Sequence, residues 1–398
     1  MAGEKKLNIL FLSSWYPNRV LPTLGNFVQK HAEAVALKSN VSALFVCSDA
    51  NCKQKYEITE STLKNVYTVN VYYKKVEHSI PVIAQLQKAN RYFRAHLLGL
   101  NVILKNWGKP DFLHHNILYP AGVIALYLKN KYRIPYIITE NWTGYLPSKK
   151  MKFGFIQTFL SKKIAANASC ITPVSKDLRD AMIHLGFNSN YEIIYNVADT
   201  KLFFPTTQKS KDRKIRLLHI STLDEAHKNI SGMLRVTAQL KNQRNDFEFW
   251  FVGDGDVTPH IKTATEMGIY NTFAFFDGTK TTTEVAVLMR SSDCFVMFSN
   301  YENLPCVIIE ALASGLPVVS STAGGVPEHI TENMGLLVAP LDEKALLESL
   351  NKIIDNIRSG KYDTDELSNY AKNNFSYESV GKKFNTLYNQ ILKTQTLR

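Results

Sequence analysis

Residues 299–328 read SNYENLPCVIIEALASGLPVVSSTAGGVPE, with two glutamates, Glu302 and Glu310, eight positions apart. Pro305 suits the first turn of a helix, where its missing N–H costs nothing, so the stretch predicts a turn that leads into a helix. The apolar run 317–320 then predicts a buried strand, which is followed by a Gly-rich turn. A turn, a helix and a strand in this order are typical of an α/β protein.

The same alternation runs through the whole chain. Short apolar runs separated by amphipathic segments predict buried strands at residues 8–12, 41–47, 111–114, 136–139, 170–174 and 191–195 in the first half, and at 216–220, 248–252, 273–276, 294–298, 317–320 and 335–338 in the second. Residues 26–37, 229–240 and 343–354 are typical of the helices between them. Such alternation predicts parallel sheets covered by helices on both faces.

The length of the chain, 398 residues, predicts two domains rather than one core. The alternation breaks at residues 197–215, a polar and basic stretch interrupted by Pro205, which we interpret as the linker. The predicted domains are residues 1–200 and residues 201–375. In residues 376–398, apolar side chains at nearly helical spacing predict a closing helix, which we expect to pack back toward the N-terminal domain.

Composition and cysteine usage favour a globular protein of a reducing compartment. The chain is 45% hydrophobic, and it lacks an apolar run of the ~18 residues that span a bilayer. The apolar run near the start covers only residues 9–12 and has no small-residue cleavage site after it, which favours a first strand over a signal peptide. The five cysteines form neither a CxxC pair nor a His/Cys cluster with metal spacing. We therefore expect a cytoplasmic protein without a metal.

The excess of positive over negative charge lies entirely in the first half. Residues 1–200 hold 25 Lys and Arg against 12 Asp and Glu, a net of +13, whereas residues 201–398 hold 22 against 23, a net of −1. The possible partners are nucleic acid, an anionic bilayer surface and an anionic substrate, and the alternative is a basic surface without a partner. Nucleic acid is disfavoured because the chain lacks Arg/aromatic stripes and a helix-turn-helix pattern.

The opening stretch has the chemistry of a nucleotide-sugar site. Free N–H groups and the helix dipole at the helix start near Pro305 favour an anion. Glu302 lies just before that start and Glu310 lies inside the helix. A carboxylate accepts two hydrogen bonds side by side, which suits a vicinal diol of a sugar or a ribose. The alternative is a pair of helix-cap and surface acids, and spacing alone leaves both readings open.

Three other segments favour the ligand. Gly253-Asp254-Gly255 follows a predicted strand and would allow a close backbone approach, although it is not a G-x-G-x-x-G motif. Lys228 follows the strand that ends near residue 220 and is a candidate counter-ion for a diphosphate, with a solvated side chain as the alternative. A further loop, residues 323–325, leads to Glu328 and is able to wrap a phosphate.

In this order, the segments resemble those of a known family. The matching pieces are VGDGD at 252–256, FFDGT at 275–279, SSDCFVMFSNYENLPCVIIEALASGLPVV at 291–319 and GGVPEHI at 324–330, together with SSWYPNRVLPTLGNFVQKHAEAVA at 13–36 and residues 171–205 in the first half. They include a Glu-x7-Glu signature. The chain resembles the family 4 glycosyltransferases, retaining enzymes whose GT-B fold has two facing Rossmann-like, doubly wound parallel-sheet domains and a deep interdomain cleft.

The resemblance implies roles for individual residues. The implied catalytic residues are Glu302, which would bind hydroxyls of the transferred sugar, Lys228, which would neutralise the diphosphate, and Asn141. The implied donor-binding residues are Gly25, Gly253, Asp254, Gly278, Asn303, Leu304 and Glu310, the last of which would hold the ribose diol. No cofactor or metal is implied.

The chain departs from the family pattern in two places. Ser221-Thr222 stands where Gly-Arg is usual before Lys228, so one expected cation is missing unless His227 or a residue of the basic first domain replaces it. Asn141 stands where the family commonly has a histidine, and an asparagine cannot act as an acid or a base.

The resemblance implies transfer of a sugar from a UDP- or GDP-linked donor to an acceptor hydroxyl with retained configuration. We expect a glycan or lipid-linked acceptor, and a peripheral position at the inner face of a membrane for the basic first domain. The alternatives are an epimerase or phosphorylase of the same fold and a nucleotide-sugar-binding protein without catalysis, the latter suggested by Thr222.

Overall fold

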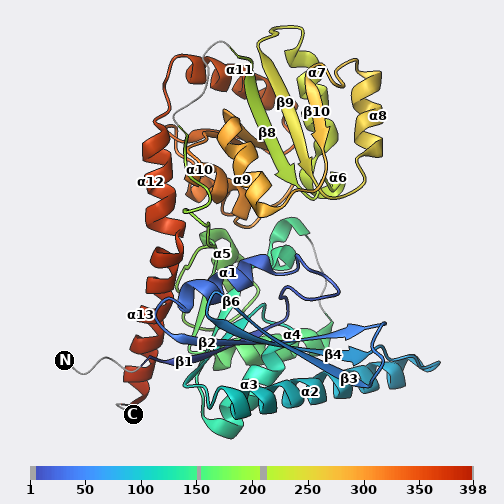
Figure 1. Ribbon diagram of the computed structural model, residues 1–398, viewed down its shortest axis with the longest axis vertical. Helices are drawn as coiled ribbons and strands as arrows, with labels where there is room; N and C mark the ends of the chain where they lie inside the picture. Colours follow the sequence, from blue (N-terminus) through green and yellow to red (C-terminus); the bar gives the residue numbers. More distant parts are fainter. Residues whose placement is uncertain (1–5, 150–153, 207–212, 397–398) are drawn as a thin grey trace.

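The computed structural model describes residues 6–149, 154–206 and 213–396, and two sheets organise them (Figure 1). The first sheet consists of β1 (Asn8–Ser13), β2 (Asn40–Asp49), β3 (Tyr56–Leu63), β4 (Val66–Lys74), β5 (Phe112–Asn116), β6 (Tyr136–Glu140) and β7 (Cys170–Pro173). Its strand order is β3-β4-β2-β1-β5-β6-β7. The strand pairs are parallel except for the antiparallel pair of β3 and β4.

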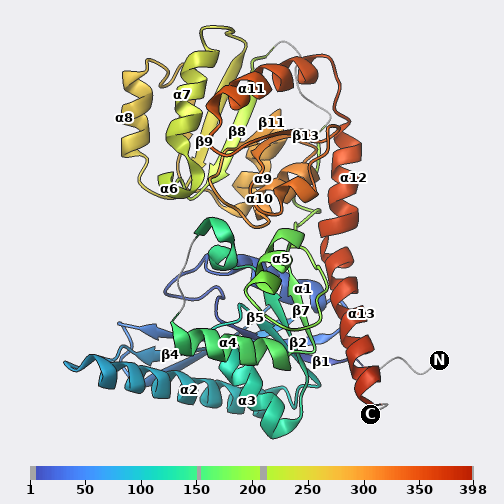
Figure 2. The same ribbon diagram turned by 180° about the vertical axis from the view of Figure 1, so that it is seen from behind.

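Alternate side chains of β1 face two different helix layers. Leu10 and Leu12 belong to the core under α2, α3 and α4, whereas Ile9 and Phe11 belong to the core under α1 and α13. The helices of the first domain are α1 (Asn26–Val35), α2 (Pro81–Asn106), α3 (Gly122–Tyr132), α4 (Phe155–Asn167) and α5 (Lys176–His184), with the 3-10 turns η1 (Thr143–Tyr145) and η2 (Pro147–Lys149), and α13 is Tyr377–Thr396. Figure 2 shows α2, α3 and α4 together on one face of the sheet.

The second sheet is parallel, with the strand order β10-β9-β8-β11-β12-β13. Its strands are β8 (Ile215–Ser221), β9 (Phe247–Gly253), β10 (Ala274–Asp277), β11 (Cys294–Met297), β12 (Val318–Ser321) and β13 (Gly335–Val338). Its helices are α6 (Glu225–Lys228), α7 (Ile230–Leu240), α8 (Thr258–Glu266), α9 (Thr282–Ser291), α10 (Cys306–Ala313), α11 (Glu343–Arg358) and α12 (Thr364–Phe375), with the 3-10 turn η3 (Val326–Glu328). The predicted two parallel α/β sheets are confirmed.

One expectation about the first sheet is wrong, and one feature of the sheet was missed. Residues 191–195 form no regular strand: Tyr191 makes a single bridge to Ile171, and the N–H groups of Glu192 and Ile194 donate to carbonyl oxygens of β7. The hairpin of β3 and β4 was not predicted. The sequence of β3, YEITESTL, is polar, and its residues are mostly exposed at the edge of the sheet, so they carry no buried apolar run.

The closing helix α13 lies against the first domain. Val380, Phe384 and Tyr388 are fully buried in the same core as α1, and Figure 1 shows α12 and α13 running down one side of both sheets. The Tyr388 hydroxyl is 2.5 Å from Nδ1 of the buried His114. The predicted domain limits stay predictions, because residues 207–212 of the predicted linker lie outside the described residues.

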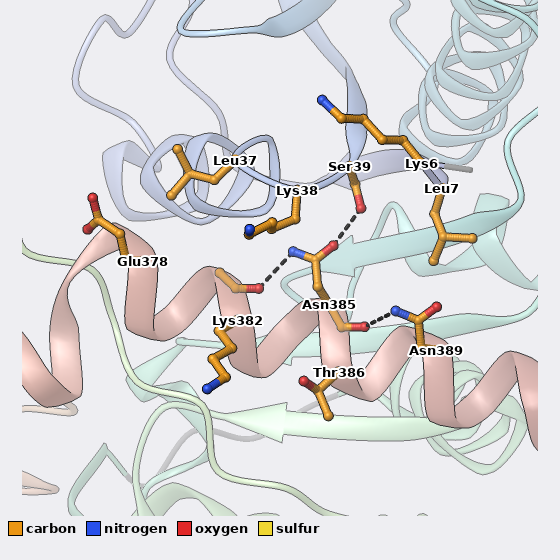
Figure 3. A pocket seen from close by; sticks show the side chains of 11 residues that line it. Lys6, Leu7, Leu37, Lys38, Ser39, Glu378, Lys382, Asn385, Thr386 and Asn389 are labelled. Atoms are coloured by element: carbon orange, nitrogen blue, oxygen red, sulfur yellow. Dashed lines mark hydrogen bonds between the residues drawn. The ribbon is translucent and has the colours of Figure 1, made fainter. Parts of the chain in front are cut away.

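A hollow of about 1040 Å³ lies where α13 meets the end of α1 (Figure 3). Asn385 anchors this contact, because it accepts a hydrogen bond from Ser39 and donates one to the carbonyl of Gly381. The hollow is also lined by Leu7, which precedes β1. It therefore lies at the amino end of β1, away from the strand ends where α/β proteins bind ligands. Within the described ranges, no helix has both the length and the apolar character to cross a membrane.

Candidate active site

The two sheets direct functional residues toward each other. Figure 1 shows β8 and β9 ending on the side that faces the first domain. The loops after the strands of the second domain carry Lys228 and Glu302, and the loop after β6 carries Asn141. Residues that are more than 100 positions apart in the sequence thus share one interface. This edge is where ligands of open α/β sheets bind.

Lys228 and Glu302 form a buried ion pair within the second domain. Lys228 ends the single turn α6, which begins at its cap Asp224, and Glu302 lies in the loop between β11 and α10. Lys228 Nζ lies 2.5 Å from Glu302 Oε1, and the two residues are 8% and 6% exposed. Burial by itself would raise the pKa of Glu302, but the charge of Lys228 and a hydrogen bond from His227 outweigh it and lower the pKa to about 2. Glu302 is therefore a carboxylate at neutral pH.

Two further basic side chains lie against Tyr301, the residue before Glu302. The ring of His227 stacks on Tyr301 with 4.2 Å between ring centroids, and its Nε2 lies 3.4 Å from Glu302 Oε1. Lys149, at the end of η2 in the first domain, places its ammonium 3.4 Å from the centroid of Tyr301. Two basic side chains are therefore candidates to replace the cation that Thr222 does not supply. They are His227 of the same domain and Lys149 of the other.

Glu310 pairs with a lysine of the first domain. It lies on α10, and its Oε1 is 2.6 Å from Nζ of Lys30, which comes from α1. Glu310 is 5% exposed. Burial would lower the pKa of Lys30, but the charge of Glu310 outweighs it and raises that pKa above its ordinary value. Lys30 was missed by the sequence analysis, because a lysine on an amphipathic helix carries no local signal of its partner 280 residues away.

A network of amides joins the two domains beside these pairs. Asn303 accepts a hydrogen bond from the Ser175 hydroxyl (2.9 Å) and donates one to the carbonyl oxygen of Asn141 (2.9 Å). The side-chain nitrogen of Asn141 donates to the side-chain oxygen of Asn196 (2.7 Å). The side-chain nitrogen of Asn196 in turn donates to the carbonyl oxygen of Leu304 (2.8 Å). The predicted residues Asn141, Asn303 and Leu304 therefore lie together. Ser175 and Asn196 were not predicted.

Two asparagines at the carboxyl ends of β5 and β6 keep unsatisfied polar atoms. Oδ1 of Asn141 and both side-chain polar atoms of Asn116 are buried without a protein partner among the described residues. Asn116 pairs in register with Thr139, just before the loop that carries Asn141. Buried amides of this kind normally find a partner, so a bound polar molecule would complete them. Asn116 was not predicted as a site residue. Its position after His114-His115, at the end of a predicted strand, was the sequence feature that could have identified it.

Two of the glycines are required by the protein backbone itself. Gly324 has a φ of +57°, and a Cβ there would lie 2.1 Å from the carbonyl oxygen of Glu302. A Cβ at Gly253 would lie 1.7 Å from the carbonyl oxygen of Ser221, at the end of β8. These glycines allow close packing of the strand-end loops. Their need for glycine is thus explained without a ligand, and the donor-binding role of Gly253 stays a prediction.

The other predicted donor residues differ in burial. Gly25 is buried just before α1 with a φ of +69°, and a Cβ there would lie 2.6 Å from the backbone of Trp15, so the backbone itself requires glycine at this position. Asp254 and Gly278 are exposed, and a Cβ at Gly278 would meet no atom within 4 Å. Thr222 is exposed as well. The structure therefore gathers Lys228, Glu302 and Glu310 at the interface, whereas it gives Gly278 no structural reason to be glycine.

Two further carboxylates are held by backbone N–H groups. Glu328, on η3 of the second domain, accepts from the N–H groups of Lys176 (2.7 Å) and Asp177 (3.2 Å) at the start of α5 in the first domain. Glu140 accepts from the N–H groups of three residues at 2.8–2.9 Å, namely Leu118, Asn141 and Trp142. Complete burial dominates over these hydrogen bonds and raises the pKa of Glu140 to about 7. Among the residues that the structure describes, no group of three or more His, Cys, Asp or Glu side chains is arranged to hold a metal ion.

Comparisons with known proteins agree with this architecture. A family model described as Glycosyltransferase Family 4 matches residues 46–202, and one described as Glycosyl transferases group 1 matches residues 214–356. The putative teichuronic acid biosynthesis glycosyltransferase TuaC of Bacillus subtilis is 22% identical over 87% of this chain and 89% of its own.

Solved structures share the whole fold. Sucrose-phosphate synthase from Thermosynechococcus elongatus has a TM-score of 0.76 at 19% identity, covering 97% of this chain and 100% of its own. HepE from Anabaena in complex with UDP has a TM-score of 0.70 at 17% identity, covering 96% and 100%.

Two facing parallel α/β sheets with a charged site at their strand ends define a protein of the GT-B class. The two family matches together cover most of the chain. The chain belongs to the family 4 glycosyltransferases, as the sequence motifs predict.

Proposed function

We propose that this glycosyltransferase moves a sugar from a nucleoside diphosphate sugar to an acceptor hydroxyl, with retention of the anomeric configuration and without a metal. One observation carries the proposal. Two buried carboxylates, Glu302 and Glu310, lie on either side of the start of α10, and each is held by one lysine. A diphosphate at the helix start would then have a sugar on one side and a ribose on the other.

The lysines contact one oxygen of each carboxylate. Lys228 and His227 lie near Oε1 of Glu302, and Lys30 contacts Oε1 of Glu310. The second oxygen of each carboxylate can accept from a diol of the donor. In this proposal, Glu302 orients the transferred sugar and Glu310 orients the ribose.

Lys228 and the start of α10 would stabilise the leaving diphosphate. Negative charge develops on the departing phosphate oxygens, and a fixed ammonium with helix N–H groups is already in place to meet it. Pro305 has no N–H to give, so the donors are the N–H groups of its neighbours. Lys149 and His227 are the candidates for the cation that Thr222 does not provide. Fixed charges of this kind do the work that a metal ion does elsewhere.

The acceptor would bind at the first domain. The unsatisfied amides of Asn116 and Asn141 suit sugar or acceptor hydroxyls, and neither side chain can take a proton. The acceptor proton would then pass to the leaving phosphate oxygen on the same face, as the resemblance implies. Attack from that face leads to retention.

The relatives suggest the class of substrates. TuaC is described as an enzyme of teichuronic acid biosynthesis, and HepE was solved with UDP. We therefore propose a UDP-linked donor, with GDP as the alternative, and a polysaccharide or lipid-linked acceptor at a membrane surface.

Thermal unfolding with UDP, GDP, ADP and their glucose conjugates tests the donor. A ligand at 100 times its Kd adds about 2.7 kcal/mol of stability. We expect the largest shift from UDP or UDP-glucose, and little shift for Glu310→Ala. NMR of the product anomeric proton and assays with EDTA test retention and metal independence. Equal responses of wild type and Glu310→Ala would contradict the site.

A second candidate, a nucleotide-sugar-binding protein without turnover, is favoured by one observation. Thr222 stands exposed where the family pattern has an arginine. This candidate predicts the same ligand-induced stabilisation but no release of nucleotide from any donor. Assays with mixed nucleotide sugars separate the two functions, because only the enzyme produces free UDP or GDP.

A further inference from the structure

The first turns of α2 project from the first domain without covering any core. Residues 81–90 are all exposed apart from the half-buried Ala84, and the buried residues of α2 begin only at Ala95. Yet Val82 and Leu86 in these turns are apolar, and they are 65% and 66% exposed. Figure 1 and Figure 2 show this end of α2 extending beyond the sheet. An apolar helix end without a core to cover indicates an interaction surface.

The first turns of α4 show the same pattern. Phe155 and Ile156 are 86% and 72% exposed, and Phe159 is 58% exposed. The buried residues of α4 lie in its second half, from Ser161 to Ala165. Large apolar side chains exposed singly are ordinary, but two helix starts of one layer that both carry several of them are not.

Both helix starts lie at the carboxyl edge of the sheet. In a parallel α/β sheet, a helix that follows a strand begins at the carboxyl end of that strand, and α2 follows β4 while α4 follows β6. This is also the edge that carries Asn116 and Asn141. Figure 2 shows α2 and α4 beginning at the same end of the layer.

The charge of this layer indicates the partner. Residues 81–167, which span α2, α3 and α4, hold 13 Lys and Arg against 2 acids, Asp111 and Glu140, a net of +11. Glu140 is fully buried, so it adds little to the surface. Almost all of the net charge of +12 of the whole chain therefore belongs to this segment.

We propose that the first turns of α2 and α4 form a docking surface for an anionic lipid bilayer. Exposed apolar side chains on helices of a strongly basic segment suit insertion at the boundary between acyl chains and anionic headgroups. The apolar tips enter the boundary while the cations remain at the headgroups. This inference rests on the proposed function only in one consequence: a lipid-linked acceptor would reach the acceptor-side asparagines from the same edge.

Flotation with lipid vesicles, in the absence of any sugar donor, tests the docking surface. We expect the full chain to float with vesicles of phosphatidylcholine and phosphatidylglycerol, and salt should release it from them. With vesicles of phosphatidylcholine alone, the protein should remain in the bottom fraction. The variants Val82→Gln/Leu86→Gln and Phe155→Gln/Ile156→Gln should each lower the vesicle partition coefficient at least about tenfold. Their melting temperatures should stay unchanged, because the replaced side chains are exposed.

Val287→Gln/Leu341→Gln is the matched control. These two apolar residues of the second domain are 52% and 67% exposed, and their loss should leave vesicle binding unchanged. Equal binding to neutral vesicles, no binding to either composition, or an equal loss in the control would each overturn the proposal. So would a concentration-dependent dimer of the wild type that Val82→Gln/Leu86→Gln abolishes, because the surface would then bind a second copy of the chain.

The outcomes also separate this inference from the proposed function. UDP-induced stabilisation depends on Glu310 and does not require the docking surface. A chain that binds UDP but not vesicles would overturn the docking surface alone, whereas a chain that binds vesicles but no nucleotide would overturn the proposed donor alone.

Discussion

The ion pair inside the second domain and the ion pair across the domain interface differ in what maintains them. Glu302 and Glu310 are almost equally buried, at 6% and 5% exposure, and each lies 2.5–2.6 Å from a lysine ammonium. Lys228 comes from a turn of the same domain, whereas Lys30 comes from the other domain. The first pair persists whenever the second domain is folded. The second pair exists only while the two domains touch.

Because of this difference, the two carboxylates respond differently to a change in the distance between the domains. A carboxylate whose counter-ion is local keeps its charge and orientation through a change in domain spacing. A carboxylate whose counter-ion lies on another domain is released into solvent when the domains separate, and in the proposed function ribose hydroxyls would then reach Glu310.

Lys228→Met should be the most damaging substitution at the interface. It leaves the Glu302 carboxylate buried without its ammonium partner, which costs about 3–5 kcal/mol in the free energy of unfolding. Transfer should slow by about 10²–10³-fold, because the diphosphate loses a fixed charge. Urea unfolding and steady-state assays measure the two effects.

The matched control is Lys228→Met/Glu302→Gln, which removes the unpaired charge and should recover most of the lost stability. The pH dependence adds a second readout. The folded-state pKa of Glu302, about 2, lies below its ordinary value of 4.5, so its contribution is complete above pH 4.5 and disappears as the pH falls toward 2. In Lys228→Met, burial should instead raise the pKa of Glu302 above its ordinary value, so the variant should be more stable at low pH and lose stability as the pH rises. A double variant as unstable as the single one would refute the coupling.

Lys30→Met should have a smaller effect on stability, about 1–2 kcal/mol, although its partner Glu310 is equally buried. When the domains separate, water can hydrate the unpaired Glu310 and so lower the cost of its burial. Glu302 is paired within its own domain, so domain separation does not hydrate it in the same way. Small-angle scattering should report a larger radius of gyration for the variant. The exposed Lys38→Met, just beyond the same helix, serves as control. If Lys30→Met destabilised the protein as much as Lys228→Met, the contrast between the two pairs would fail.

Glu140 extends the comparison to a carboxylate without a lysine. Its pKa of about 7 lies above the ordinary 4.5, so the folded state binds this proton more tightly and loses stability as the pH rises from about 4.5 to 7. Glu140→Gln should flatten that decline. It should also cost about 1–2 kcal/mol at pH 5, because the amide nitrogen faces a backbone N–H. Denaturant unfolding at several pH values measures both effects, and the exposed Glu348→Gln should keep the wild-type slope.

Substitution of Glu328, which contacts the other domain, should have the smallest effect on the free energy of unfolding. Glu328→Ala removes the carboxylate that accepts from two N–H groups at the start of α5, which costs about 1 kcal/mol. Amide exchange should become faster in the first turn of α5, while Glu332→Ala, at a neighbouring exposed position, should leave it unchanged. Unaltered exchange in Glu328→Ala would mean that this contact does not hold the domains together.

Most of the fold could be predicted because buried parallel strands carry their signal locally. The runs around β1, β11 and β12 are short apolar stretches followed by turns, and the hydrophobic pattern suffices to find them. The hairpin of β3 and β4 escaped because its outer strand is polar and exposed. The run 191–195, YEIIY, was misleading because its β-branched and aromatic residues also suit an irregular segment, in which only Ile194 is buried.

The predicted site residues lie in one motif or, like Lys228 and Asn141, shortly after a predicted strand. Glu302, Asn303 and Glu310 share one stretch of sequence, so their proximity follows from a turn and a short helix. Lys30, Ser175 and Asn116 lie in the other half of the chain, on elements whose own sequence gives no sign of the partner. No local pattern encodes a contact across 280 residues.

By itself, the sequence determined the two parallel sheets, the family and the glutamates that flank the start of α10, because these follow from hydrophobic periodicity and from residues close together in the chain. The tertiary structure alone decided which cation each glutamate meets, that Glu328 caps a helix of the other domain, and that α2 and α4 begin at one edge. Long-range packing sets those distances, and periodicity contains no information about them.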